Sequence, residues 1–236
     1  MARSRIRSAG YARQTRRRQG CWMAVILIGA GGHAGVVADA LMACGRTIAA
    51  VCVEGVAGGQ FAGLPIRGLD DLPALGREGH AEVHVAIGQP RARARLGLWL
   101  QAQGFRLATI IHPAACISPS ACVAEGVFVA AGTIIGPGAR IGARAILNHR
   151  CSLDHDAEVS EDAHLAPGVL TGGYARVGAR SWIGLGTVLR DRVEIGADSF
   201  IGAGSLVLKS IPDRALAYGQ PARVVRALAD GDWPYP

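Results

Sequence analysis

The stretch 132–148, GTIIGPGARIGARAILN, decides the fold because its apolar residues recur every six positions. Outward from it, the same spacing holds in seventeen consecutive registers between Ile111 and Val207, and only Thr171 is not aliphatic. Four residues after each member of this series the chain carries a second residue, which is small in nearly every register. A composition rich in Ala, Gly and Val does not by itself produce so long a pattern without a slip.

Neither a helix nor a twisted open sheet repeats every six residues, whereas a solenoid of short flat strands with a corner every six residues does. We expect the aliphatic residues to point inward and three six-residue faces to form one coil. Neighbouring coils then stack at about 4.8 Å, so that residues eighteen apart lie above one another. Glycine often follows the aliphatic residue, as at Gly136 and Gly142, where we expect a turn that needs an unusual φ.

The chain before the repeats has the pattern of a small α/β unit. We expect a strand over 24–28, a glycine loop over 29–35, a helix to Cys44, strands over 47–53 and 82–87, and a helix from Pro90 to Gln103. A strand, glycine loop and helix in this order are typical of a Rossmann-like site, in which backbone N–H groups face phosphate. The unit is too short for a complete dinucleotide fold, which argues against an NAD-dependent dehydrogenase.

The charge distribution excludes a nucleic-acid-binding body. The net charge is +7, but the first 22 residues carry seven arginines and no acid, so the remainder is neutral. Three interpretations of this extension remain open: translation that starts at Met23, a solvated tail, or a targeting segment. No apolar run is long enough to span a membrane. The six cysteines include no CxxC pair, which favours reduced thiols in the cytoplasm.

Together the two halves resemble the bacterial sugar O-acyltransferase family of hexapeptide-repeat enzymes. This family includes sialic acid O-acetyltransferases and N-acetyltransferases of nucleotide-linked 4-amino-6-deoxy sugars. The resemblance covers about residues 24–226, and its most specific segment is LNHRCSLDHDAEVSEDAHLAPG, residues 147–168. GQPAR at 219–223 matches the family's closing segment.

The resemblance implies a fold class and a domain order. The fold is an α/β Rossmann-like half-domain followed by an all-β left-handed parallel β-helix, assembled as a homotrimer with acetyl-coenzyme A between neighbouring prisms. The expected domains are a basic extension (1–22), a nucleotide-sugar-binding domain (23–108), an acyltransferase domain (109–211) and a C-terminal tail (212–236).

The resemblance also assigns residues. His155 matches the general base and Asp156 the acid that raises its basicity, although by position Asp154 could also orient the ring. His164, which we expect at a coil corner, matches a residue that contacts the acetyl group or its thioester. The remaining matches hold the nucleotide sugar (Gly31, Gly32, His33, Glu54 and Gly88) or line the coenzyme A groove (Leu185 and Ala203).

Spacing adds Gly173 to the coenzyme A group, because it lies eighteen residues after His155 and leaves a gap above the base. His155 and His164 are nine residues apart, half a coil, so a site that uses both lies between two subunits.

Three positions depart from the family pattern. Glu54 is followed by Gly55 where relatives often carry two acids, His149 replaces a residue that is commonly threonine, and Ala203 stands where glycine is frequent. We expect a structural role for His149.

The sequence therefore predicts an acetyl-coenzyme A-dependent enzyme without a metal that N-acetylates a nucleotide-linked amino sugar for surface glycan synthesis. The alternative is O-acetylation of sialic acid or a related sugar. Two remote alternatives are a γ-carbonic-anhydrase-like zinc enzyme, whose histidine spacing His149, His155 and His164 do not reproduce, and a non-catalytic nucleotide-sugar-binding protein.

Overall fold

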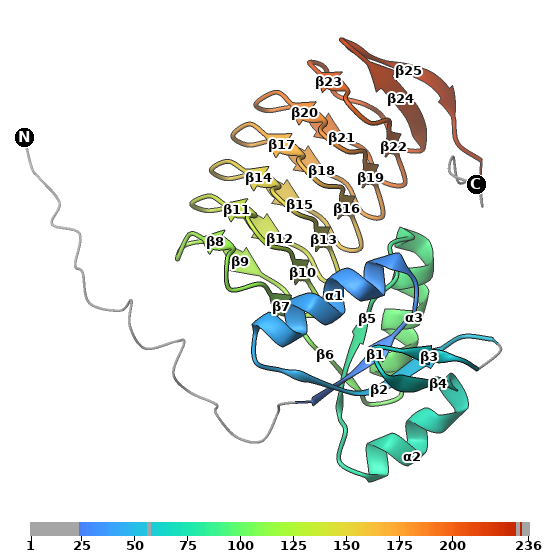
Figure 1. Ribbon diagram of the computed structural model, residues 1–236. Helices are drawn as coiled ribbons and strands as arrows, with labels where there is room; N and C mark the ends of the chain where they lie inside the picture. Colours follow the sequence, from blue (N-terminus) through green and yellow to red (C-terminus); the bar gives the residue numbers. More distant parts are fainter. Residues whose placement is uncertain (1–23, 56–57, 230–231, 233–236) are drawn as a thin grey trace, which may run out of the picture.

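The computed structural model describes residues 24–55, 58–229 and 232, and Figure 1 shows a small α/β domain beside a long prism of short strands. The basic extension 1–22 and Met23 lie outside the described residues. None of the helices in the described part of the chain has the length and apolar character that a bilayer crossing needs.

The α/β domain is built on a six-stranded sheet in the order β3-β4-β2-β1-β5-β6. Its elements are β1 (Ala24–Ile28), α1 (Gly32–Ala43), β2 (Thr47–Val53), β3 (Gln60–Phe61), β4 (Leu64–Gly68), the 3₁₀ turn η1 (Leu69–Asp71), α2 (Leu72–Arg77), β5 (Glu82–Val85), α3 (Pro90–Ala102) and β6 (Arg106–Leu107). The buried β1 lies between β2 and β5 and is parallel to both. Helix α3 begins at Pro90 as expected, and the Gln89 side chain caps it by accepting the Ala92 N–H at 2.5 Å.

The prism consists of two-residue strands, three to each eighteen-residue coil. The strands are β7 (Ile110–Ile111), β8 (Cys116–Ile117), β9 (Cys122–Val123), β10 (Phe128–Val129), β11 (Ile134–Ile135), β12 (Arg140–Ile141), β13 (Ile146–Leu147), β14 (Ser152–Leu153), β15 (Glu158–Val159), β16 (His164–Leu165), β17 (Leu170–Thr171), β18 (Arg176–Val177), β19 (Trp182–Ile183), β20 (Val188–Leu189), β21 (Glu194–Ile195), β22 (Phe200–Ile201) and β23 (Leu206–Val207). Each strand pairs in parallel with the strand one coil away, as Phe128 does with Ile146.

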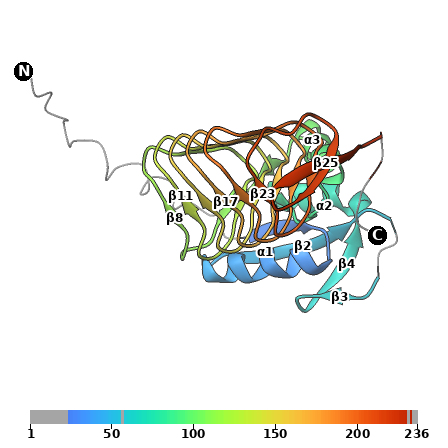
Figure 2. The same cartoon turned by 90° about the horizontal axis from the view of Figure 1, so that it is seen from above.

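The triangular cross-section is visible along the prism axis in Figure 2. Face 1 contains β7, β10, β13, β16, β19 and β22, face 2 contains β8, β11, β14, β17, β20 and β23, and face 3 contains β9, β12, β15, β18 and β21. Ile135, Leu153 and Ile183 are at most 1% exposed, so the aliphatic series points inward as predicted. The expected fold, a Rossmann-like half-domain followed by a left-handed parallel β-helix, is confirmed.

The glycines that follow the aliphatic residues have a different role from the one expected. Gly142 does not have a positive φ; the left-handed residue of its corner is Arg144, with φ of 57°. A Cβ on Gly142 would lie 2.5 Å from the backbone nitrogen of Glu161 on the next coil. These glycines therefore allow two backbones to approach closely, and the turn itself tolerates larger residues.

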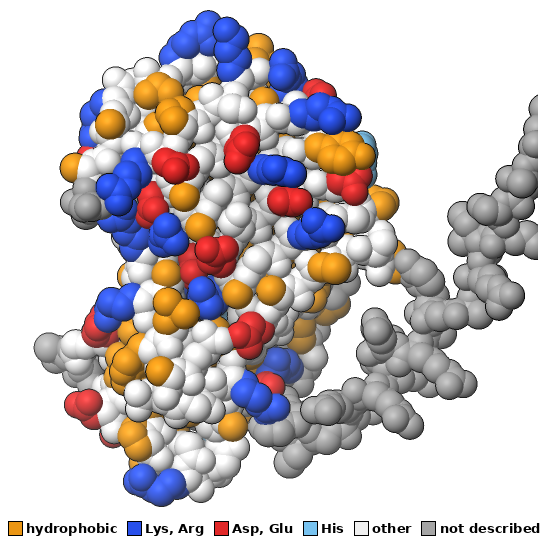
Figure 3. All heavy atoms as spheres, turned by 180° about the vertical axis from the view of Figure 1, so that it is seen from behind, with side chains coloured by type: hydrophobic (Ala, Val, Ile, Leu, Met, Phe, Trp, Pro, Cys, Tyr) orange, Lys and Arg blue, Asp and Glu red, His pale blue; other side chains and the backbone are white. Residues whose placement is uncertain are grey.

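The three faces differ in their outward side chains. On face 3, Arg140, Glu158, Arg176 and Glu194 alternate in charge on successive coils, and Figure 3 shows this alternation of blue and red on the side seen from behind. Face 2 carries Ile134, Leu170 and Val188, which are 50%, 45% and 38% exposed. Face 1 is covered by the α/β domain, because the side chains of α1 pack on Phe128 and Ile146.

Arg93 of α3 holds the two domains together and is 1% exposed. Its guanidinium donates to the carbonyls of Ile87 and Gly88, both at 2.8 Å, on the α/β side. On the prism side it donates to three further carbonyls: Arg144 at 2.8 Å, Asp162 at 2.5 Å and Ala163 at 3.3 Å. A buried cation is tolerated when its donors are all satisfied, so this joint fixes one arrangement of the domains.

The chain continues the prism beyond residue 211. Strand β24 (Ala215–Gly219) pairs in parallel with β22, and β25 (Ala222–Ala227) then pairs with β24 in the antiparallel direction. The peptide bond between Gln220 and Pro221, in the turn between them, is cis.

The close approach at Gly142 gives a stability prediction. We expect Gly142→Ala to lower the free energy of unfolding by about 1–3 kcal/mol, because the added methyl group forces two backbones apart. Gly35→Ala is the control: nothing lies within 4 Å of a Cβ at this position in α1, and alanine is the better helix former by about 0.5–1 kcal/mol. Urea unfolding followed by circular dichroism measures both changes. Equal midpoints for the two variants would contradict the packing explanation.

Candidate active site

His155 and Asp156 form a dyad at the corner between faces 2 and 3. The His155 side chain is half exposed, and its Nδ1 lies 3.0 Å from Asp156 Oδ2. A hydrogen bond from His155 and a second from Tyr174 lower the pKa of Asp156, which therefore remains a carboxylate and accepts the Nδ1–H. The Nε2 atom then carries the lone pair that a general base needs.

Asp154, the other candidate to orient the ring, has a different contact. Its Oδ1 accepts the backbone N–H of His155 at 2.7 Å, so it supports the corner rather than the imidazole. The geometry favours Asp156 as the partner of the ring.

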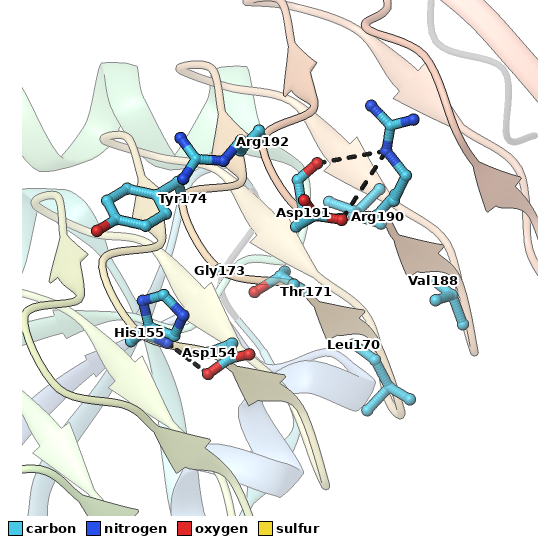
Figure 4. Close-up of a pocket in the computed structure, with 12 residues that line it drawn as sticks. Asp154, His155, Leu170, Thr171, Gly173, Tyr174, Val188, Arg190, Asp191 and Arg192 are labelled. Carbon is cyan, nitrogen blue, oxygen red and sulfur yellow. Dashed lines mark hydrogen bonds and ion pairs between the residues drawn. The ribbon is translucent and has the colours of Figure 1, made fainter.

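Gly173 lies directly above the imidazole on the next coil. A Cβ at this position would be 2.6 Å from His155 Nε2, so the ring occupies the space that glycine leaves. Figure 4 shows His155 and Gly173 beside one cavity, together with Leu170, Thr171 and Asp191. The cavity has a volume of about 440 Å³.

Tyr174 supports the dyad and was not predicted from the sequence. Its ring meets His155 edge to face with centroids 5.2 Å apart, and the Arg192 guanidinium lies 4.6 Å from the centroid of the tyrosine ring. Tyr174 has φ of 59° at its corner. The only available signal was its place eighteen residues after Asp156, which stacks the two positions.

The glycine loop places the predicted nucleotide-sugar residues at the carboxyl edge of the parallel sheet. Gly31 is the N-cap of α1 and has no side-chain cap, and both Gly31 and Gly32 are exposed with open space around them. This helix N-terminus can receive a phosphate. Gly88 follows β5 at the same edge, where ligands of open α/β sheets bind.

Glu54 follows β2 but is not a free carboxylate. Arg95 donates to both of its oxygens, at 2.8 and 2.5 Å, and this pairing lowers the pKa of Glu54. Both side chains are more than half exposed, so contact between Glu54 and a ribose or base requires that this ion pair opens or is shared.

His164 lies on a strand and not at the corner where we expected it. It is the outward residue of β16 on face 1 and is 3% exposed beneath the α/β domain. Its Nδ1 is 3.0 Å from the Gly88 carbonyl oxygen, and its ring centroid is 5.8 Å from that of His33. His164 is therefore grouped with two residues predicted to bind the sugar.

Leu185 and Ala203 stack on the corner between faces 1 and 2. Both are exposed, Leu185 by 52%, and the Leu185 carbonyl accepts the Gly204 N–H at 2.7 Å. Lower on the same corner, His149 and Pro167 line a cavity of about 600 Å³. One chain thus presents Leu185 and Ala203 on one corner and Gly173 with His155 on another, while His164, which was also predicted to contact the acetyl group or its thioester, lies on face 1.

Two features bear on the kind of chemistry. Within the described ranges, no group of three or more His, Cys, Asp or Glu side chains is placed to hold a metal ion. Cys151 points inward and is fully buried, and burial raises the pKa of its thiol to about 12. This cysteine is unsuited to carry an acyl group, because the thiolate is the nucleophile.

Comparison with known proteins finds a matching family model and similar solved structures. Residues 24–98 match the family described as the PglD N-terminal domain. Galactoside O-acetyltransferases of Lactococcus lactis and Escherichia coli are 48% identical over 52 residues and 46% identical over 59 residues. These matches cover 22% and 25% of this chain, and only 25% and 29% of the two enzymes.

Two of the similar solved structures are matched over nearly their whole length. A variant of GDP-perosamine N-acetyltransferase from Caulobacter crescentus, in complex with CoA and GDP-perosamine, is 40% identical with a TM-score of 0.83, over 85% of this chain and 96% of that chain. The acetyltransferase domain of PglB from Neisseria gonorrhoeae, in complex with acetyl coenzyme A, is 31% identical with a TM-score of 0.80, over 86% and 99%. Sequence identity and coverage at this level, together with the repeat prism and its α/β domain, show that the chain belongs to the bacterial sugar acyltransferase family of hexapeptide-repeat enzymes.

Proposed function

We propose that this protein transfers the acetyl group of acetyl-coenzyme A to the amino group of a nucleotide-linked 4-amino-6-deoxy sugar. The observation that carries this proposal is the His155–Asp156 dyad, whose Nε2 lies in the space that Gly173 leaves on the next coil. The Caulobacter relative is an N-acetyltransferase bound to CoA and GDP-perosamine, which supports both substrate classes. The product would supply surface glycan synthesis, and the availability of acetyl-coenzyme A fits the cytoplasmic location that we predict.

In the proposed reaction, Nε2 of His155 takes a proton from the attacking amine as nitrogen bonds to the thioester carbonyl carbon. Asp156 stabilises the resulting imidazolium. The tetrahedral intermediate then collapses, the C–S bond breaks, and the imidazolium returns the proton to the departing thiolate. Transfer is direct, so no acyl-enzyme forms.

We further propose that two subunits of a homotrimer form each active site. His155 and Gly173 lie at the corner between faces 2 and 3, whereas Leu185 and Ala203 lie at the corner between faces 1 and 2. The exposed apolar side chains of face 2 lie between these corners and suit burial against a neighbouring prism. In this arrangement the groove of one subunit receives coenzyme A, and the dyad of the next reaches its thioester.

Mixed oligomers test the shared site. His155→Ala removes the base, and Leu185→Glu places a charge on the opposite corner. We expect each variant alone to be nearly inactive, and an equal mixture that is unfolded and refolded together to regain about a quarter of wild-type activity, because random closed assembly pairs two intact halves at that frequency. Separately refolded, then mixed, samples are the control. Full activity in a monomer, or no recovery in the mixture, would contradict a shared site.

The substrate class is tested by coenzyme A release with acetyl-coenzyme A and a panel of UDP-, GDP- and dTDP-linked 4-amino sugars, with free sialic acid included. We expect turnover with one amino sugar and a loss of about 10²–10⁴-fold in kcat for His155→Ala, as is typical for a general base. His80→Ala, outside the dyad, is the control. Turnover with sialic acid alone would favour O-acetylation, and binding without turnover would favour a nucleotide-sugar-binding protein.

Two adjacent glycines separate catalysis from stability. Gly173→Ala pushes against the tip of the His155 side chain, whereas a Cβ on Gly172 would lie 2.5 Å from the backbone nitrogen of Asp191. We expect Gly173→Ala to lower kcat/KM by about 100-fold, because small displacements at a reacting centre have effects of this size, with little change in the melting temperature. Gly172→Ala should lower the melting temperature. Normal kinetics for Gly173→Ala would show that the imidazole position is not critical.

A further inference from the structure

A column of four residues runs along the corner between faces 2 and 3. Gly138, Asp156, Tyr174 and Arg192 are eighteen residues apart, so they stack on successive coils, and their φ angles are 71°, 56°, 59° and 59°. Glycine adopts this left-handed conformation freely and aspartate tolerates it, whereas a bulky side chain there has a conformational cost. Tyr174 is the one aromatic residue with a positive φ in the described ranges. Such costs are concentrated at functional sites, so a functional reason for this tyrosine is expected.

The proposed dyad at this corner is exposed. The side chains of His155 and Asp156 are 50% and 45% exposed, and an ion pair between exposed side chains is weak. The pair alone therefore does not hold the imidazole in one orientation. A general base must nevertheless be held in place, because small displacements at a reacting centre reduce the rate strongly.

Tyr174 contacts both members of the dyad. Its hydroxyl group donates a second hydrogen bond to the Asp156 carboxylate, beside the one from His155. Its ring meets the imidazole edge to face, with an interplanar angle of 89°, and Figure 4 shows the tyrosine ring above the imidazole. The Tyr174 backbone N–H donates to the His155 carbonyl oxygen at 3.1 Å. One residue thus fixes the direction of the imidazole and of the carboxylate that pairs with it.

The two ends of the column hold this arrangement. A Cβ at position 138 would lie 2.5 Å from Asp156 Oδ1, so the carboxylate occupies the space that glycine leaves below it. On the other side of Tyr174, the Arg192 guanidinium lies over the phenol ring, 4.6 Å from its centroid. A cation over an aromatic ring is attracted to it. The Arg192 backbone N–H donates to the Gly173 carbonyl oxygen at 2.9 Å, which anchors the arginine to the coil of Tyr174.

We propose that Tyr174 is a positioning residue for the base His155, and that Arg192 holds Tyr174 in place. Tyr174 keeps Asp156 as the acceptor of the Nδ1–H, so that Nε2 carries the lone pair that removes the proton of the amine. Neither Tyr174 nor Arg192 takes or gives a proton in the reaction. The inference rests on the proposed function, in which His155 is the base, and adds to it residues from two further coils.

The first test observes the imidazole and does not depend on activity. Long-range ¹H–¹⁵N spectra of the full chain labelled with ¹⁵N-histidine, assigned with His155→Gln, report which nitrogen carries the proton in the neutral ring. We expect Nδ1–H for the wild-type protein and a mixture of both tautomers for Tyr174→Gly, because the carboxylate is then free to turn away. Glycine adopts the left-handed conformation without strain, so this variant should fold. An unchanged Nδ1–H ring in Tyr174→Gly would overturn the proposal.

The second test separates positioning from substrate binding. Tyr174→Phe removes only the hydroxyl group, and we expect kcat to fall about tenfold with KM for both substrates within about twofold of wild type. Tyr174→Gly removes the ring as well and should lower kcat about 100-fold. Tyr218→Phe is the matched control, because Tyr218 is 51% exposed on β24, and it should leave kcat unchanged.

Two outcomes of these kinetics would contradict different claims. A rise in KM for acetyl-coenzyme A with unchanged kcat in Tyr174→Phe would make Tyr174 a coenzyme A contact and overturn the positioning role. Absence of turnover in the wild-type protein would instead contradict the proposed function, and the spectra would still decide whether Tyr174 fixes the imidazole.

Arg192 is tested by two substitutions that differ in charge. Arg192→Lys keeps a cation over the tyrosine ring, whereas Arg192→Met removes it. We expect Arg192→Met to lower kcat about threefold, the factor that one exposed cation–π contact supplies, and to add the second His155 tautomer to the spectra. Arg192→Lys should change neither. Arg176→Met is the control on face 3, where Arg176 lies 3.7 Å from Glu158. Lower coenzyme A affinity at unchanged kcat in Arg192→Met would make Arg192 a ligand contact and overturn its supporting role.

Discussion

The stacking of one coil on the next at a fixed offset of eighteen residues is the constraint on which this structure depends. Backbone N–H groups donate to carbonyls of the following coil, as Ile134 does to Cys151 at 2.8 Å and Ser152 to Val169 at 2.9 Å. A slip of one residue would turn the aliphatic side chains outward, so the register cannot drift. The same offset of eighteen residues places Gly173 over His155, so the stacking that builds the core also positions the His155 imidazole.

The α/β domain has a defined position on the prism because its contact with the prism is polar as well as apolar. Packing of α1 on face 1 buries apolar surface but does not fix the orientation of the α/β domain, since hydrophobic contact is not directional. Arg93 adds direction through its hydrogen bonds to carbonyls of both domains. The bidentate pair of Arg144 with Asp162, at 2.9 and 2.7 Å, satisfies the neighbouring buried charges. The joint thus holds the glycine loop of the α/β domain in a fixed position relative to the repeat prism.

The periodicity of the sequence predicted the prism and the inward set, because burial acts on every sixth side chain alike. It could not distinguish two reasons for glycine, and at Gly142 close backbone approach applies rather than a positive φ. His164 was misplaced at a corner although it directly precedes the aliphatic Leu165, a position that lies on a strand and faces outward.

The His155–Asp156 pair was predicted from the resemblance to the family, since by position Asp154 could serve equally well, whereas the joint was not predicted. Arg91, Arg93 and Arg95 alternate in one helix, and nothing in their spacing shows that only the second is buried. Tyr174 was missed for a related reason: its contact with His155 follows from the direction of a side chain at a left-handed corner.

The hairpin of β24 and β25 covers the last strand edge of face 1. A stack of parallel coils ends in unpaired backbone groups, onto which another chain could add strands. Here β25 runs in the opposite direction across the end of face 1 and carries Arg223 and Arg226, the second of which pairs with Asp232. An incoming coil would meet a reversed, charged strand instead of a matching edge. The hairpin therefore closes the β22 edge of face 1 with a strand that a further parallel coil does not match.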